Sequence, residues 1–202
     1  MSLAIYYRAT DSKELVRSIK EIPEVLIQKV ESILLEGAEE QEFRQESAAL
    51  RSMVLGLEQT PQQKLWLGNV FIGLCQAYSV PLPYGGYYYL ELHTEGIEDC
   101  MKEDFGLEDF TFSEYFFGRY NQFSPLDLPN YGGFPIVGFI PSEALKELAG
   151  RMAHIAISDD DLWELKRDMD NYRAECYAYI RGIKQDFTFC AEQGLDLFSF
   201  CH

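Results

Sequence analysis

Glu91, His93 and Glu95 are the residues whose types and spacing come nearest to a metal site. Side chains at i, i+2 and i+4 lie on one face of a β-strand, and we expect a strand over residues 86–93. Two carboxylates and an imidazole on one face could bind a divalent metal. A solvent-facing row on an antiparallel edge strand accounts for the same spacing, and we favour that interpretation. We therefore predict no metal and no cofactor.

Histidines and cysteines are too few and too scattered for the common catalytic or zinc-binding arrangements. The chain has three histidines and five cysteines, with no CxxC pair. Cys190, Cys201 and His202 lie close in sequence but lack a fourth zinc ligand. We expect reduced, buried thiols in a cytoplasmic protein. The sequence shows neither a signal peptide nor an apolar run long enough to span a membrane.

Motifs of the large enzyme classes are absent from the sequence. It contains no GxxxxGKS/T, GxGxxG, GxSxG or HExxH, the patterns of phosphate-binding loops, dinucleotide sites, nucleophile elbows and zinc proteases. Whether the chain is an enzyme therefore stays open, and the absence of these motifs favours a protein that is not an enzyme. No catalytic residue is predicted.

Residues 84–139 differ in composition from the rest of the chain. They hold 15 of the 29 aromatic residues, 8 of the 15 glycines, and ten acidic residues against two basic ones. Their net charge is −8, half of the −16 of the whole chain. Aromatic side chains give large contact areas and glycine-rich loops present them, so this composition is typical of a binding region.

Eight residues of this segment form the predicted ligand-binding set: Tyr84, Tyr87, Tyr89, Glu91, Tyr120, Asp127, Tyr131 and Phe134. One hypothesis places them on an acidic, aromatic contact surface. The alternative is a small-molecule enzyme or sensor, with a pocket lined by Tyr87, Tyr89, Tyr120, Tyr131 and Phe134. In that case Glu91, Asp127 or His93 would do acid/base chemistry. For any single aromatic residue, packing as core beneath a long loop is the more common outcome.

The net charge limits the possible partners. Nucleic-acid binding needs lysine and arginine to neutralise phosphates, and an anionic membrane surface attracts basic segments rather than acidic ones. We therefore expect no nucleic acid and no membrane as a partner. A basic protein fits better, because complementary potentials speed association and impose specificity. The leading hypothesis is a protein-binding module of the immunity or inhibitor type. One example would be a module that neutralises a toxin or nuclease by imitating the charge of nucleic acid.

A mainly helical single domain of the α+β class accounts for the hydrophobic patterning of residues 1–202. Helical periodicity marks residues 11–79 and 142–193, and the aromatic, acidic and loop-rich segment 84–141 separates them. Strands are predicted near residues 3–9, 86–93, 136–140 and 195–201. We expect these strands to form a small, mostly antiparallel sheet that contains both the first and the last strand.

One apolar seam runs from Leu162 to Phe187. Its members recur at spacings of three and four residues, which predicts one long helix ended by Gly194. The seam could pair with a second copy as a coiled coil, or it could pack inside the domain. Its Met, Tyr and Cys residues favour internal packing, and we expect a monomer or a homodimer.

A short pattern in the second half of the chain resembles a known family. Leu126-Asp127-Leu128-Pro129, then Phe134-Pro135-Ile136-Val137-Gly138-Phe139, and then Glu143 follow a tyrosine-rich stretch that ends at Leu90-Glu91. Over roughly residues 84–202, this pattern is similar to a family of uncharacterised bacterial proteins that is known only as a domain of unknown function. The resemblance implies a bacterial protein but no activity, cofactor or site residue.

Overall fold

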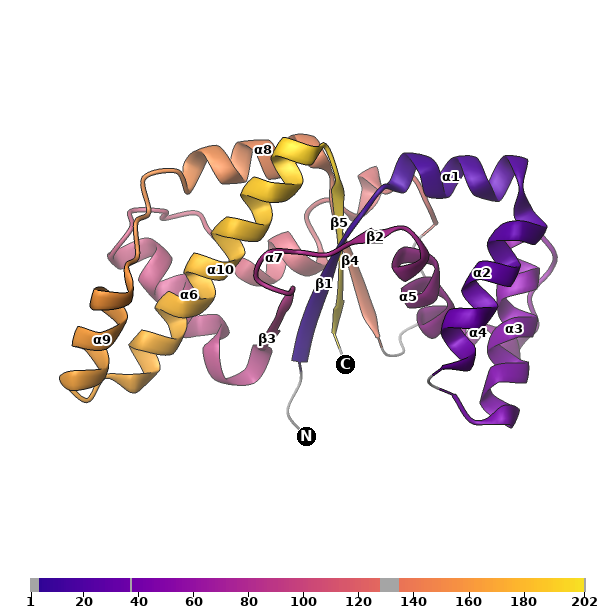
Figure 1. The fold of residues 1–202 in the computed structure, drawn as a ribbon, viewed down its shortest axis with the longest axis horizontal. Helices are drawn as coiled ribbons and strands as arrows, with labels where there is room; N and C mark the ends of the chain where they lie inside the picture. The colour runs from indigo at the N-terminus through magenta and orange to yellow at the C-terminus, as the bar shows by residue number, and fades with distance from the viewer. Residues whose placement is uncertain (1–3, 37, 128–134, 202) are drawn as a thin grey trace.

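The first and last strands pair at the centre of the sheet (Figure 1). The computed structural model describes residues 4–36, 38–127 and 135–201, and for residues 87–92 it describes the course of the chain only. β1 (Ala4–Thr10) pairs antiparallel with β5 (Asp196–Cys201), and β4 (Ile136–Ile140) pairs antiparallel with the other side of β5. The predicted α+β class, mainly helical with a small antiparallel sheet, is confirmed.

Two short strands share the free edge of β1. β2 (Ser79–Val80) pairs with Ala9 and Thr10, and β3 (Tyr87–Tyr89) pairs with the opposite end of β1. Between them the Tyr7 N–H donates to the Gly86 carbonyl at 2.8 Å. Gly86 has a φ of +69°, and a Cβ there would overlap the Tyr7 carbonyl oxygen, so this close approach requires glycine.

The first half of the chain covers one face of the sheet (Figure 1). It forms α1 (Ser12–Glu21), α2 (Pro23–Leu35), α3 (Glu40–Val54), α4 (Pro61–Lys64) and α5 (Leu67–Ala77). α5 lies against the sheet, where the Phe71 and Phe198 rings meet edge to face at 5.5 Å. The other helices pack around α5 through a second cluster that includes Leu26, Val30 and Leu50.

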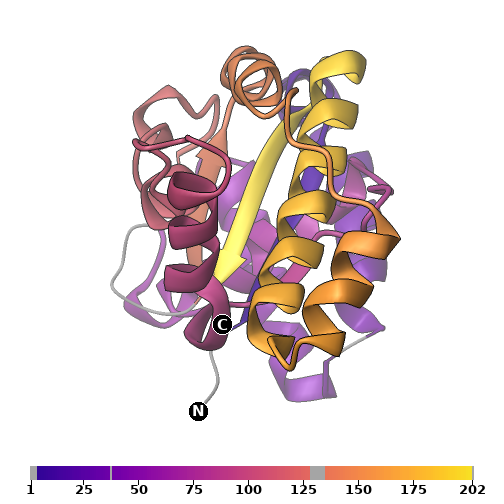
Figure 2. The same cartoon turned by 90° about the vertical axis from the view of Figure 1, so that its left-hand side faces the viewer.

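The second half of the chain covers the opposite face (Figures 1 and 2). It forms α6 (Leu90–Glu103), α7 (Phe112–Phe117), the 3-10 helix η1 (Asn121–Phe123), α8 (Ser142–Arg151), α9 (Asp159–Arg167) and α10 (Asn171–Gln193). α10 crosses the sheet and packs against α6, α8 and α9. Ile180, Ile183 and Phe187 of α10 are fully buried in this core. None of the helices that the structure describes is both long and apolar enough to cross a membrane.

Alternate residues of β5 enter different cores. Leu197 and Cys201 pack with the helices of the second half, whereas Phe198 and Phe200 pack with α5. The same alternation divides Ile5 and Tyr7 of β1 from Tyr6. Both central strands are therefore buried on two faces.

The helix predicted along the apolar seam is interrupted. The helix expected from Leu162 to Phe187 breaks after α9, because Met169 adopts a left-handed conformation with a φ of 64°. Within the helical region predicted over residues 11–79, α4 and α5 are separated by a turn at Leu65 and Trp66. Gly194 ends α10 in the left-handed region, as predicted.

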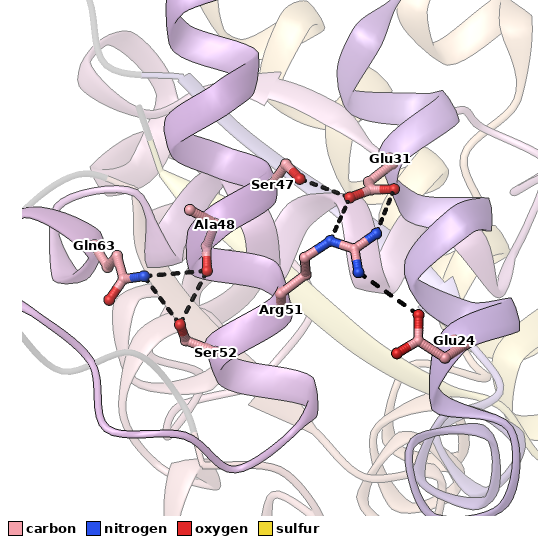
Figure 3. A network of polar contacts seen from close by, with 7 residues as sticks. All are labelled: Glu24, Glu31, Ser47, Ala48, Arg51, Ser52 and Gln63. Atoms are coloured by element: carbon pink, nitrogen blue, oxygen red, sulfur yellow. Dashed lines mark hydrogen bonds and ion pairs between the residues drawn. The ribbon is translucent and has the colours of Figure 1, made fainter.

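A polar network fastens α2, α3 and α4 to one another (Figure 3). Arg51 of α3 donates to both oxygens of Glu31 on α2, at 3.0 and 3.2 Å, and lies 3.6 Å from Glu24. The Glu31 carboxylate raises the pKa of Arg51 through hydrogen bonding and charge. Gln63 of α4 donates to Ser52 at 2.9 Å. All three nitrogens of the Arg51 guanidinium therefore lie close to a carboxylate oxygen.

We predict that Gly138→Ala destabilises the protein, whereas Gly150→Ala does not. A Cβ at Gly138 would overlap the Phe116 carbonyl oxygen, so α7 would have to move away from β4, at a cost of roughly 2–3 kcal/mol. Gly150 has open space around it in α8, and alanine there is expected to add roughly 0.5–1 kcal/mol. Urea unfolding of both variants checks the pair, and equal stabilities would contradict the close packing of α7 on the sheet.

Candidate functional site

Most of the described aromatic residues between positions 84 and 139 pack inside the protein. Phe110, Phe112, Tyr115, Phe116 and Phe139 are buried. The rings of Phe112 and Phe116 stack at 4.3 Å. For these residues the aromatic composition builds a core beneath α7 and its flanking loops rather than a contact surface.

Asp186 is a buried carboxylate that fastens Tyr84 to α10. It accepts hydrogen bonds from the Tyr84 N–H at 2.8 Å and from the Tyr7 hydroxyl at 3.0 Å. The ring of Tyr84 lies where a Cβ of Gly182 would stand. Burial raises the pKa of Asp186, and the hydrogen bonds partly offset this rise. Tyr84, from the predicted set, thus packs on α10 and keeps 37% of its surface exposed.

The other members of the predicted set are not joined at one site within the described parts of the chain. Tyr120 is half-buried, with its ring 6.2 Å from that of Tyr115, and Asp127 is exposed. No described hydrogen bond, ion pair or ring contact links Tyr84, Tyr120 and Asp127 to one another. For Tyr87, Tyr89 and Glu91 only the course of the chain is described, and Tyr131 and Phe134 lie outside the described residues. The set stays a prediction.

The residues weighed as metal ligands do not share a strand face. Glu91, His93 and Glu95 belong to α6, where residues two apart point to nearly opposite sides of the helix. The strand predicted over residues 86–93 is wrong beyond Tyr89, because His93, Ile97 and Met101 recur at helical spacing and are buried there. Among the described residues, no group of three His, Cys, Asp or Glu side chains is placed to hold a metal.

His93 joins α6 to α10. Its Nε2–H donates to Glu175 at 2.7 Å, and its ring stacks on Tyr172 with centroids 5.5 Å apart. Tyr179 lies against another side of the ring, at 4.9 Å. The side chain is nearly fully buried, so these contacts make it part of the packing between the two helices.

The five cysteines are buried thiols. Burial raises the pKa of Cys190 to about 12 and also raises the pKa values of Cys75 and Cys201. A thiol reacts as its thiolate, so these three are poor nucleophiles at neutral pH. They serve as small core residues.

α9 and the start of α10 form a helical hairpin at one end of the molecule (Figure 2), and large apolar side chains of this hairpin are exposed. None of the described residues of α9 is buried. Trp163 is 61% exposed, Met169 84% and Tyr172 49%. Trp and Tyr are enriched among the residues that dominate protein interfaces, and Met is enriched in interfaces generally. Three such side chains on one hairpin make it the strongest candidate for a contact surface.

Met169 stands where a helix end normally places glycine. Its N–H donates to the Lys166 carbonyl at 3.2 Å, and the next N–H, of Asp170, donates to Leu165 at 2.9 Å. This is the Schellman arrangement, whose left-handed residue is usually glycine. Every other described residue with a positive φ is a glycine. The side chain therefore occupies a strained position and gains no burial in return.

Acidic side chains surround these apolar ones. Between Asp159 and Glu175 the chain has seven acidic and three basic residues, and all seven acids are exposed. Two of the three bases are already close to a carboxylate, Arg167 to Asp168 at 3.5 Å and Arg173 to Asp104. Glu95, Asp99 and Glu103 add exposed acids on α6, which packs beside α10. The hairpin thus presents apolar side chains within a negative surface.

Periodicity alone misses this surface, because Met169 and Tyr172 fit the apolar seam, for which internal packing is the favoured interpretation. A signal was nevertheless present in the run Asp168-Met169-Asp170-Asn171. Asp and Asn favour helix ends over helix interiors. Asp170 does begin α10, by accepting the Arg173 N–H at 3.0 Å.

The fold defined by these elements is an α+β domain with helices on both faces of an antiparallel sheet. Over residues 1–202 the chain matches the family described as Domain of unknown function (DUF7691), and it belongs to that family. The match therefore extends well before residue 84, where the sequence pattern suggested that the resemblance begins. Comparison with curated proteins and with solved structures found no match.

We predict that Asp186→Asn changes stability in a pH-dependent way. The raised pKa means that the folded wild type binds a proton more tightly than the unfolded chain does. Its contribution to stability is therefore greatest below the unfolded pKa of about 3.9 and is lost as pH rises through the raised folded pKa. Asn keeps an acceptor oxygen for the Tyr84 N–H and does not ionise. The free energy of unfolding of the variant therefore increases relative to that of the wild type as pH rises.

Urea unfolding of both proteins between about pH 3.5 and pH 8 checks this prediction. Asp186→Leu is the control, because it removes the acceptor of the Tyr84 N–H, at a cost of roughly 1–3 kcal/mol at every pH. A stability difference between wild type and Asp186→Asn that stays constant with pH would contradict the role of burial at this carboxylate.

Proposed function

We propose that the protein is a bacterial, cytoplasmic protein-binding module of the immunity or inhibitor type, and that the α9 and α10 hairpin binds a basic partner. The observation that carries the proposal is Met169, an exposed apolar side chain in a left-handed position that glycine would fill with less strain. Strain of this kind persists where function requires it. A partner that covers Met169 would supply the burial that the free protein lacks.

Charge supports a basic partner. The exposed acids of α9, of the turn at Asp168 and Asp170, and of α6 give the hairpin a negative surface. Such a surface speeds encounter with a positive one and repels acidic competitors. Apolar anchors in the middle then provide the affinity that exposed charges do not. A toxin or nuclease with a basic, nucleic-acid-binding surface is one partner of this kind.

The small-molecule alternative stays a prediction. The residues that it uses lie largely outside the described side chains. A groove of about 690 Å³ is lined by apolar residues, among them Ile155, Ile157 and Phe189, but it contains no member of the predicted set. Its two cations already have partners, Asp159 for Arg181 and two backbone carbonyls for Lys184.

We predict that Met169→Gly stabilises the protein and weakens partner binding. Glycine relieves the left-handed strain, worth about 1 kcal/mol, and removes the apolar anchor. Trp163→Ala is expected to weaken binding about tenfold as well, without the gain in stability. Immobilised wild type and variants are used to capture proteins from a lysate of the source organism. A protein that the wild type retains is then purified and titrated against the wild type and each variant.

Leu65→Ala is the matched control, since Leu65 is 65% exposed but lies between α4 and α5. A supporting result is a basic protein that the wild type and Leu65→Ala retain, that Met169→Gly and Trp163→Ala lose, and that is released between about 50 mM and about 300 mM salt. Retention by Met169→Gly at wild-type affinity, or recovery of acidic proteins only, would overturn the proposal.

A further inference from the structure

Arg8 of β1 is a half-buried cation that has no partner among the described residues. Within the described residues its guanidinium makes no ion pair, hydrogen bond or cation–π contact, and its Nε is buried and unpaired. Each of the other arginines has a carboxylate or hydroxyl partner: Arg17, Arg44, Arg51, Arg119, Arg151, Arg167, Arg173 and Arg181. In a chain with 33 acidic and 17 basic residues, a missing counter-charge stands out.

The guanidinium lies on the sheet face that α5 covers. Arg8 is directly opposite Phe198 of β5, a residue of the core beneath α5. Burial raises the pKa of Cys75 on α5, and the positive charge of Arg8 partly offsets that rise. Thr10, two residues along the same face of β1, is fully buried, and its hydroxyl also has no hydrogen-bond partner among the described residues.

The segments outside the described residues carry no acidic side chain. Residues 1–3, 37, 128–134 and 202 contain no Asp or Glu. Glu91, whose side chain is not described, belongs to α6, which covers the opposite face of the sheet (Figure 1). The buried Nε–H of Arg8 and the buried Thr10 hydroxyl each cost roughly 1–3 kcal/mol while they have no hydrogen-bond partner. Among the described residues, the site therefore has donors and lacks an acceptor.

We propose that Arg8 binds the oxyanion group of a small ligand, a carboxylate or a phosphate, with the Thr10 hydroxyl as a second donor. The planar guanidinium presents paired N–H groups that match the oxygens of either group. A small ligand fits better than a macromolecule, because the Arg8 Nε and the Thr10 hydroxyl are buried. The site is on the opposite side of the sheet from the α9 and α10 hairpin and does not depend on the function proposed for that hairpin.

Thermal unfolding with simple anions tests the proposal. Wild type is heated in sodium phosphate, sodium acetate or sodium chloride at matched ionic strength and pH. We expect phosphate or acetate to raise the Tm by at least about 2 °C over chloride, as a ligand that binds only the folded state does. Phosphate alone raising the Tm assigns a phosphate-bearing ligand, and acetate alone assigns a carboxylate.

Two variants locate the effect. Arg8→Gln is expected to abolish the anion-dependent rise while keeping the wild-type Tm in chloride, because no ion pair or hydrogen bond described for the Arg8 guanidinium is lost. Thr10→Val keeps the shape of the side chain and is expected to reduce the rise. Arg44→Gln, at an exposed arginine, is the control and should keep it. No rise in the wild type, or a rise that survives Arg8→Gln and Thr10→Val, overturns the proposal.

Discussion

Burial of the β1 and β5 pair on both faces is the constraint on which the rest of the structure depends. Successive residues of each strand enter different cores, so a shift of one residue in the pairing would exchange the two sets of side chains. The helices of the first half need the Phe198 side of the pair, and those of the second half need the Leu197 side. Because these strands lie at opposite ends of the chain, neither core is complete until the ends have met, an arrangement of high contact order.

Polar groups at the margins of this pair then fix the helices. Asp196, at the start of β5, accepts the Ser142 N–H at 2.8 Å and also bonds to the Ser12 hydroxyl, which holds the starts of α8 and α1 to the same strand end. Ser199 donates to the Phe116 carbonyl beneath α7. Asp186 ties α10 to Tyr7 of β1. Each of these groups is a short side chain whose donor or acceptor has a defined partner, so the helix positions follow from the strand register.

The sequence predicted those features that local chemistry determines. β4 occupies the residues predicted for it, because Pro135 excludes a helix just before Ile136, and α9 begins at the capping box that Ser158 and Asp161 form. Features decided by tertiary packing were missed. The tyrosine-rich run favours a strand locally, but burial of His93 and Ile97 against α10 makes a helix from Leu90 onward. Met169 fits the apolar seam by spacing, but the left-handed turn at this residue ends the helix and its side chain is exposed. The predicted aromatic set was limited in the same way, because composition does not distinguish a core ring from an exposed one.

The two proposed sites share one physical property. Most of the chain is locally consistent, with capping residues at helix starts, glycine at positive φ and carboxylates beside arginines. Met169 departs from the glycine rule, and Arg8 departs from the pairing of arginines. Neither departure improves packing in the free protein, since Met169 is exposed and Arg8 has no partner in the part of the chain that the structure describes. A bound molecule could compensate each one, an apolar contact at Met169 and an oxyanion at Arg8. Because α10 lies on one side of the sheet and the Arg8 side chain on the other, the two sites can be occupied without competing for the same surface.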